Sequence, residues 1–202
     1  MKKTVSVPKV TAREPRQARS RQKVELMLEA TIRILDNQGM EGLTTNAVAA
    51  KAGISIGTIY QFFPNKEAIV DSLADREMAQ LSARVLAIMR DQTVASARKR
   101  VAAVVSAVAA SYGRRSGAHR VVMARSLTRG VNRLAPLMAR LREHLTSERS
   151  SGRFREPLSP ADAFVIPYAI HGVLRGMISE AEAPPQEEIE RSLTRLIVSA
   201  LG

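Results

Sequence analysis

The sequence contains no cysteine and no long apolar segment, and each absence excludes a class of protein. Without cysteine, the 202-residue chain cannot form disulfides, thiolate metal sites or a cysteine nucleophile, so packing must supply its stability. Its longest nearly uninterrupted apolar run, 101–110, is about half a membrane span and contains Ser106. The basic N-terminus is not followed by an apolar stretch of signal-peptide length before Arg13. We therefore expect a cytoplasmic protein without a membrane segment.

The patterns that usually mark an enzyme or a metal protein are also missing. The histidines, His119, His144 and His171, are spread along the chain without metal-ligand spacing. No glycine-rich phosphate loop occurs, and no nucleophile stands in a recognisable elbow motif. We therefore expect no enzymatic activity, no cofactor and no metal.

Sustained alternation of apolar and polar residues, the mark of β-strands, is absent, whereas helical spacing recurs along the whole chain. The periodicity and the glycine and proline breaks predict an all-α fold. The expected helices cover residues 21–38, 44–52, 55–63, 66–91, 94–113, 117–128, 133–150, 160–180 and 186–201.

The 31 Lys/Arg residues outnumber the 19 Asp/Glu residues, which gives the chain a net charge of +12. Residues 1–23 contain eight Lys/Arg against Glu14 alone. A segment of this composition cannot bury enough apolar surface to order itself, so we expect residues 1–20 to form a disordered basic arm. Such an arm is attracted to polyanions, although a solubilising tail is an alternative reading.

The densest pattern is the stretch SIGTIYQFFP, residues 55–64, which holds three of the seven aromatic residues. With the preceding residues it fits a helix-turn-helix: a small Ala49 permits close helix crossing, and Gly53 permits the positive φ of a tight turn. Ile56, Ile59, Phe62 and Phe63 then form an apolar stripe that we expect to be buried, while Tyr60 faces outward. No acidic residue lies between Thr44 and Asn65, as expected of a surface that meets phosphates.

Residues 44–73, TTNAVAAKAGISIGTIYQFFPNKEAIVDSL, resemble the DNA-binding signature of TetR-type transcriptional repressors. The resemblance is close over about residues 21–73 and beyond them extends only to length and helix count. Phe62 departs from it, because members often carry histidine there. The resemblance implies an N-terminal three-helix helix-turn-helix DNA-binding domain over 21–66, followed by a helical effector-binding and dimerisation domain over 67–202.

Roles for individual residues follow from the pattern and the resemblance together. We expect Thr45 to cap its helix and to bind a phosphate through its hydroxyl or backbone N–H. Gln61 is the candidate for reading a base edge, and Tyr60 and Lys66 resemble the family's phosphate contacts. Ser55 either caps the recognition helix or reaches a phosphate. The candidate DNA contacts are Thr44, Thr45, Ser55, Gly57, Thr58, Tyr60, Gln61 and Lys66.

The remaining two thirds of the chain give weaker signals. We expect a homodimer through the last two helices, about 160–201, where apolar faces and the Gly172/Gly176 pair favour close helix contact, although packing within one chain explains each residue equally well. The candidate effector-pocket residues are Met89, Tyr112, Met123, Phe164, Tyr168, His171 and Met177, each of which could instead be ordinary core. Residues 95–155 contain fourteen Arg/Lys and two acids. Either some of these cations select an anionic effector or they are solvated helix faces; the candidates are Arg98, Arg114, Arg115, Arg120, Arg125, Arg129 and Arg133.

Two functions fit these observations. The first is a dimeric repressor that binds a palindromic double-stranded DNA operator and is released by a small-molecule effector. The second is a constitutive or architectural DNA-binding protein without a small-molecule switch, in which the basic charge supplies most of the affinity.

Overall fold

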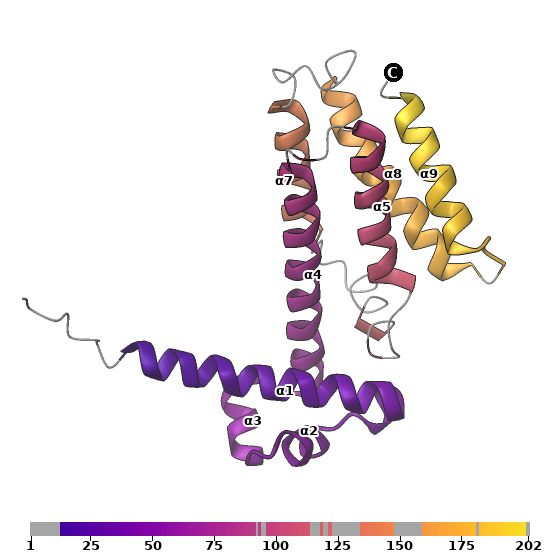
Figure 1. The fold of residues 1–202 in the computed structure, drawn as a ribbon. Helices are drawn as coiled ribbons and strands as arrows, with labels where there is room; N and C mark the ends of the chain where they lie inside the picture. The colour runs from indigo at the N-terminus through magenta and orange to yellow at the C-terminus, as the bar shows by residue number, and fades with distance from the viewer. Residues whose placement is uncertain are drawn as a thin grey trace, which may run out of the picture. The chain divides into compact units, whose positions relative to one another are not determined.

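The computed structural model describes residues 13–91, 93, 96–113, 118, 121–122, 134–147, 159–180 and 182–200. Over these residues the chain is helical and contains no strand, which confirms the all-α prediction (Figure 1). It divides into two compact units, Met1–Val70 and Asp71–Gly202. The helices are α1 (Arg13–Gly42), α2 (Thr45–Ala52), α3 (Ile56–Phe62), α4 (Lys66–Arg90), α5 (Ala97–Gly113), α7 (Ala135–Ser147), α8 (Pro160–Ser179) and α9 (Gln186–Ala200).

The first helix is longer than predicted. It begins at Arg13 rather than Arg21, because Arg, Gln, Glu and Ala favour helix and Pro15 lies in the first turn, where its missing N–H needs no partner. The expected break at Gly39 is present, with φ 63° and ψ −162°, but helical backbone resumes and continues to Gly42. The expectation of a disordered arm stays a prediction for residues 1–12, which lie outside the described residues.

The first unit is held together by apolar side chains from its helices. Met27 and Leu35 of α1, Val48 of α2 and Ile59 of α3 are fully buried or nearly so, and α2 contacts both α1 and α3. The predicted apolar stripe of α3 is only partly correct. Ile59 and Phe63 are buried and Phe62 is half-buried, but Ile56 is 38% exposed because it begins the helix at the edge of the turn.

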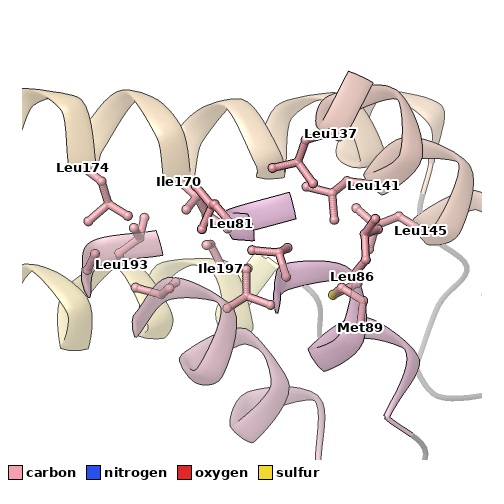
Figure 2. Close-up of a cluster of buried hydrophobic side chains, with 14 of the residues drawn as sticks. Leu81, Leu86, Met89, Leu137, Leu141, Leu145, Ile170, Leu174, Leu193 and Ile197 are labelled. Atoms are coloured by element: carbon pink, nitrogen blue, oxygen red, sulfur yellow. The ribbon is translucent and has the colours of Figure 1, made fainter. Parts of the chain in front are cut away.

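The second unit has its own core, and Figure 2 shows leucine and isoleucine side chains converging from different helices. In this unit α5 contacts α8 and α9, α7 contacts α8, and α8 contacts α9. The buried cluster contains Met78, Leu81, Val85, Leu86, Met89, Val104, Val105, Ala109, Leu137, Leu141, Leu145, Ala163, Ile170, Leu174, Leu193 and Ile197. Burial of these side chains is the main source of this unit's stability, because the chain has no disulfide.

A buried arginine fixes the C-terminal end of α4. Arg100, only 8% exposed, donates from Nη1 to the Met89 carbonyl at 2.9 Å and from Nη2 to the Asp91 carbonyl at 2.8 Å. His144 of α7 also lies 3.1 Å from the Met89 carbonyl through Nε2. The last carbonyls of a helix have no partner within the helix. These side chains supply partners and thereby tie α4 to α5 and α7.

Helix α8 begins with a complete capping box. Ser159 Oγ accepts from Asp162 N at 3.1 Å, and the Asp162 carboxylate accepts from Ser159 N at 2.9 Å. Hydrogen bonds from the Ser159 side chain and backbone lower the pKa of Asp162. The helix continues through Pro167, which is buried. No described helix is long and apolar enough to cross a membrane.

Candidate nucleic-acid interface

The turn between α2 and α3 has the geometry that the sequence predicts. Gly53 ends α2 in the left-handed conformation, with φ 67° and ψ 35°. This conformation lets Gly53 N donate to the Ala50 carbonyl at 3.3 Å and Ile54 N donate to the Ala49 carbonyl at 3.1 Å. An L-residue with a Cβ is strained in this region, so glycine is the residue that closes the turn without cost.

Two hydroxyl side chains cap the helices on either side of this turn. Thr44, rather than Thr45, caps α2: its backbone is extended, and Oγ1 accepts from Ala47 N at 3.0 Å. The prediction that Thr45 is the cap is wrong, because Thr45 is already the first helical residue and the cap position is occupied by Thr44. Ser55 caps α3, accepting from Thr58 N at 3.2 Å, which supports the capping alternative for this residue.

Tyr60 joins the outer face of α3 to the start of α2. Its hydroxyl lies 3.3 Å from Thr45 Oγ1, although the two residues are fifteen apart in sequence. Tyr60 is 56% exposed, so its hydroxyl reaches the surface while part of the side chain is covered by the protein. Two hydroxyl groups from two helices therefore meet at one point of the surface. Such a pair can donate to a single phosphate group.

The other candidate contacts surround this point. Gln61 and Gly57 are exposed, and a side chain added at Gly57 would have no neighbour closer than Ser55 Oγ at 3.9 Å. Thr58 is half-buried, and its hydroxyl is 2.9 Å from Ser55 Oγ. Lys66 begins α4 just after Asn65, whose Oδ1 accepts from Ala68 N at 2.8 Å and so caps that helix. The surface combines hydroxyl and amide groups with a lysine.

Residues 27–73 match the family model described as bacterial regulatory proteins, tetR family. Over 64 residues the chain is 33% identical to the HTH-type transcriptional repressor KstR of Mycolicibacterium smegmatis, an alignment that spans 32% of this chain and 31% of that protein. Residues 27–73 thus form the DNA-binding region that the tetR family model describes.

Two further comparisons extend beyond this DNA-binding region. It is 29% identical over 140 residues to the nucleoid occlusion factor SlmA of Citrobacter koseri, covering 69% of this chain and 67% of SlmA. The crystal structure of the transcriptional regulator FadR from Bacillus subtilis in complex with stearoyl-CoA shares the fold, with a TM-score of 0.61 and 21% identity. That match covers 88% of this chain and 99% of FadR. The chain thus has the fold of TetR-like regulators, an N-terminal helix-turn-helix followed by a helical C-terminal domain.

The second unit contains an apolar cavity of about 30 Å³. Its walls come from α4, α5, α7 and α8, and four of its residues are labelled in Figure 2: Leu81, Leu137, Leu141 and Ile170. The full lining is Leu81, Val85, Val104, Val108, Leu134, Leu137, Met138, Leu141, Pro167, Ile170 and His171. This volume accommodates about one or two water molecules, so an organic ligand must displace the walls to enter.

Among the predicted pocket residues, His171 lines this cavity. Burial, and then the charge of Arg175, lower the pKa of His171 below its ordinary value of 6.5, so the ring is neutral at pH 7. Met89 and Met177 belong to the core packing instead. Met123 and the side chain of Tyr112 lie outside the described residues.

The placement of Phe164 and Tyr168 on an inner face is wrong. These side chains are 47% and 39% exposed, and their rings stack on each other with centroids 4.7 Å apart. Arg142 lies over the Phe164 ring at 5.8 Å. The error arose because the buried face of α8 is formed by Ala163, Pro167 and Ile170. The exposed face of the same helix carries Phe164 and Tyr168.

Sequence reasoning missed most of the cavity lining. The residues of α7, Leu137, Met138 and Leu141, show ordinary helical periodicity, which identifies a buried face but not the face that encloses a void. Among the arginines proposed to select an anionic effector, Arg98 is exposed and the others lie outside the described residues.

Proposed function

We propose that this TetR-family regulator is a dimeric repressor that binds a palindromic operator and is released by a small-molecule effector. The observation that carries the DNA-binding part is the exposed Tyr60 hydroxyl beside Thr45, with Gln61 next to it on the outer face of α3. Because no acidic residue occurs between Thr44 and Asn65, this surface presents no carboxylate of its own segment to DNA phosphates.

The contacts divide into positioning and reading. Thr44, Thr45, Tyr60 and Lys66 hold the protein on phosphates through hydroxyl groups and a lysine charge. Gln61 reads a base edge, because its carboxamide can accept and donate at once as adenine requires. Gly57 allows the backbone of α3 to approach the groove closely. Thr58 contributes mainly its methyl group, since its hydroxyl already bonds Ser55.

Dimerisation through α8 and α9 is supported by the apolar side chains that these helices expose. Phe164, Val165 and Tyr168 share the outer face of α8 with Gly172, and Leu196 of α9 is 64% exposed. Exposed apolar groups that lie together on one face usually mark an interaction surface. A two-fold dimer also explains how such short recognition helices read enough base pairs, since two half-sites are bound at once.

Gly172 adds an independent argument for this interface. Glycine within a helix costs about 1 kcal/mol relative to alanine. A Cβ added at Gly172 would meet nothing within 4 Å, so the described packing within one chain does not require glycine there. Close approach of a helix from a second protomer would require it.

The effector part rests on the cavity between α4, α5, α7 and α8. Its lining is apolar except for His171, so an apolar ligand that enters must push these helices apart. FadR from Bacillus subtilis, which shares the fold, was solved in complex with stearoyl-CoA, and this supports an effector with an apolar chain. An effector that prefers the widened state would shift the population away from the form that fits the operator spacing.

The experiment is a binding titration of the full chain on DNA flanking its own coding region, at physiological salt, with random DNA as competitor. The proposal predicts a palindrome that is bound at least about a thousand-fold more tightly than random DNA. Equal affinity for the palindrome and random DNA would refute the repressor.

A constitutive DNA-binding protein remains the second candidate, and the observation that favours it is the similarity to SlmA, whose name describes nucleoid occlusion. This function predicts DNA binding that no small molecule reverses. A screen of metabolite extracts against the bound palindrome separates the two candidates, because release by any purified component supports the repressor and uniform retention supports the constitutive protein.

The dimer is tested by sedimentation velocity of the variant Val165→Glu, with Arg140→Glu on α7 as a matched control outside the proposed interface. The first substitution introduces a charge on the apolar face and should give monomers. The second changes an exposed residue and should leave dimers. If both variants sediment as the wild type does, the interface lies elsewhere.

A further inference from the structure

Arg84 of α4 has a positive charge in the second unit, and it forms no ion pair with the described residues. Its Nη2 donates to Ser111 Oγ of α5 at 3.3 Å. Its Nε is buried and has no hydrogen-bond partner among the described residues.

Ser111 does not neutralise this charge. The serine is 3% exposed, and its own hydroxyl proton is directed to the Ala107 carbonyl at 3.1 Å. Its oxygen is therefore oriented to accept from Arg84 but remains a neutral partner. Arg84 is half-buried, but its Nε is fully buried, and a buried donor without a hydrogen-bond partner calls for a ligand, ion or water to complete it.

This arginine adjoins the apolar cavity. Val85, the next residue of α4, lines the cavity, and so does Leu81, which precedes Arg84 by one helical turn. On α5, Val108 lines the cavity and Ser111 follows it by one turn. The Arg84–Ser111 pair therefore lies beside the seam of α4 and α5 that forms one wall of the cavity.

We propose that Arg84 binds the anionic head group of a hydrophobic effector whose apolar part enters the cavity. The ligand class is an amphipathic anion, a carboxylate or phosphate ester on an aliphatic or aromatic body. A guanidinium can bind either anion through two parallel hydrogen bonds, and its free Nε is one of the donors of that fork. This inference rests on the effector-binding part of the proposed function. It assigns the charge selection to a residue outside the arginine-rich segment 95–155.

The test is isothermal titration calorimetry on the full-length protein without DNA, with decanoate, decyl phosphate and the neutral decanol as ligands of equal chain length. The variants are Arg84→Gln and, as matched control, Arg90→Gln, which removes the same charge from an exposed position of the same helix. We expect the wild type and Arg90→Gln to bind at least one anion about 10- to 100-fold more tightly than decanol. In Arg84→Gln this preference should disappear while decanol binding persists.

The comparison of ligands within each variant separates recognition from folding, because a destabilised protein would lose decanol and the anions together. Arg84→Lys provides a second variant, which keeps the charge without the fork and should retain part of the preference. Equal affinity of the wild type for decanol and both anions, or an unchanged preference in Arg84→Gln, overturns the proposal. Absence of binding by all three ligands overturns it as well.

The outcome is distinguishable from that of the proposed function. If the anions release the protein from its operator and Arg84→Gln responds to them as the wild type does, the repressor stands and the anion site fails. If the anions bind through Arg84 but DNA remains bound, the site stands and release by this ligand class fails.

Discussion

Replacement of Arg100 by methionine tests whether the end of α4 is held as the structure describes. The guanidinium makes two hydrogen bonds to backbone carbonyls, at 2.9 and 2.8 Å, and the residue is 8% exposed. A hydrogen bond that involves a charged group contributes about 1.5–3 kcal/mol. Two of them give about 3–6 kcal/mol before the cost of burying the charge is subtracted.

Two effects reduce this figure. Methionine retains much of the apolar stem of Arg100, so packing loss is small, and the removal of a buried charge returns part of its desolvation cost. In addition, the Met89 carbonyl keeps His144 Nε2 at 3.1 Å, so mainly the Asp91 carbonyl loses its partner. We therefore expect Arg100→Met to lower the free energy of unfolding by about 2–3 kcal/mol.

The measurement is urea unfolding followed by circular dichroism at equal protein concentration, because the proposed dimerisation would make stability concentration-dependent. Arg98→Met is the matched control: it lies on the same helix but is exposed, and should change stability by less than about 0.5 kcal/mol. Arg100→Lys should fall between the two, since an ammonium cannot reproduce the two-carbonyl geometry. A stability of Arg100→Met within about 0.5 kcal/mol of the wild type would refute this account of the helix end.

Three further predictions concern the DNA-binding unit and the cavity. Tyr60→Phe should weaken binding to all DNA sequences about 3- to 10-fold, whereas Gln61→Ala should reduce the preference at one base pair by about 1–3 kcal/mol. Fluorescence anisotropy titrations with single-base operator variants measure both effects. The reverse pattern would contradict the roles assigned to these residues. Gly53→Ala should lower the free energy of unfolding by about 1–2 kcal/mol in urea, because the backbone φ at Gly53 is 67°. Gly57→Ala, in helical backbone, should be neutral or stabilising. Equal effects of the two substitutions would contradict the turn geometry. Because partial burial lowers the pKa of His171, the unfolded chain binds a proton more readily than the folded chain as pH falls below 6.5. The wild type should therefore lose stability from pH 7.5 to 5.5, and His171→Leu should lose less. Parallel losses in the urea midpoints of the two proteins would count against a neutral, half-buried ring.

The sequence predicted the helices well where local signals are strong. Gly53 and the Ser159-Pro160 pair mark helix ends through backbone chemistry that depends on few neighbours, and both helix ends lie where the pattern placed them. The start of α1 was missed, because the basic composition of residues 13–20 suggested disorder although its residues also favour helix.

Side-chain directions at the candidate sites were predicted largely correctly in the first unit but only in part in the second. Tyr60 lies outward and Ile59 inward as the helical period requires. In the second unit, the same reasoning placed Phe164 inward, because periodicity alone does not reveal which of two apolar faces a helix buries. The Arg84–Ser111 hydrogen bond joins residues that are 27 apart in sequence, and a local sequence pattern cannot predict such a contact.

Gly39 has a consequence for the way variants of this protein are interpreted. Its torsion angles, φ 63° and ψ −162°, lie in a region that only glycine adopts readily, yet a Cβ at this position would meet nothing within 4 Å. Replacement of Gly39 by any natural residue should therefore destabilise the protein, although the position is partly exposed and a side chain there would meet no steric conflict. The mirror image of these angles is close to the polyproline II conformation of an ordinary L-residue. A D-alanine introduced by chemical synthesis should thus fit where L-alanine does not, and should stabilise the helix break by restricting the unfolded chain.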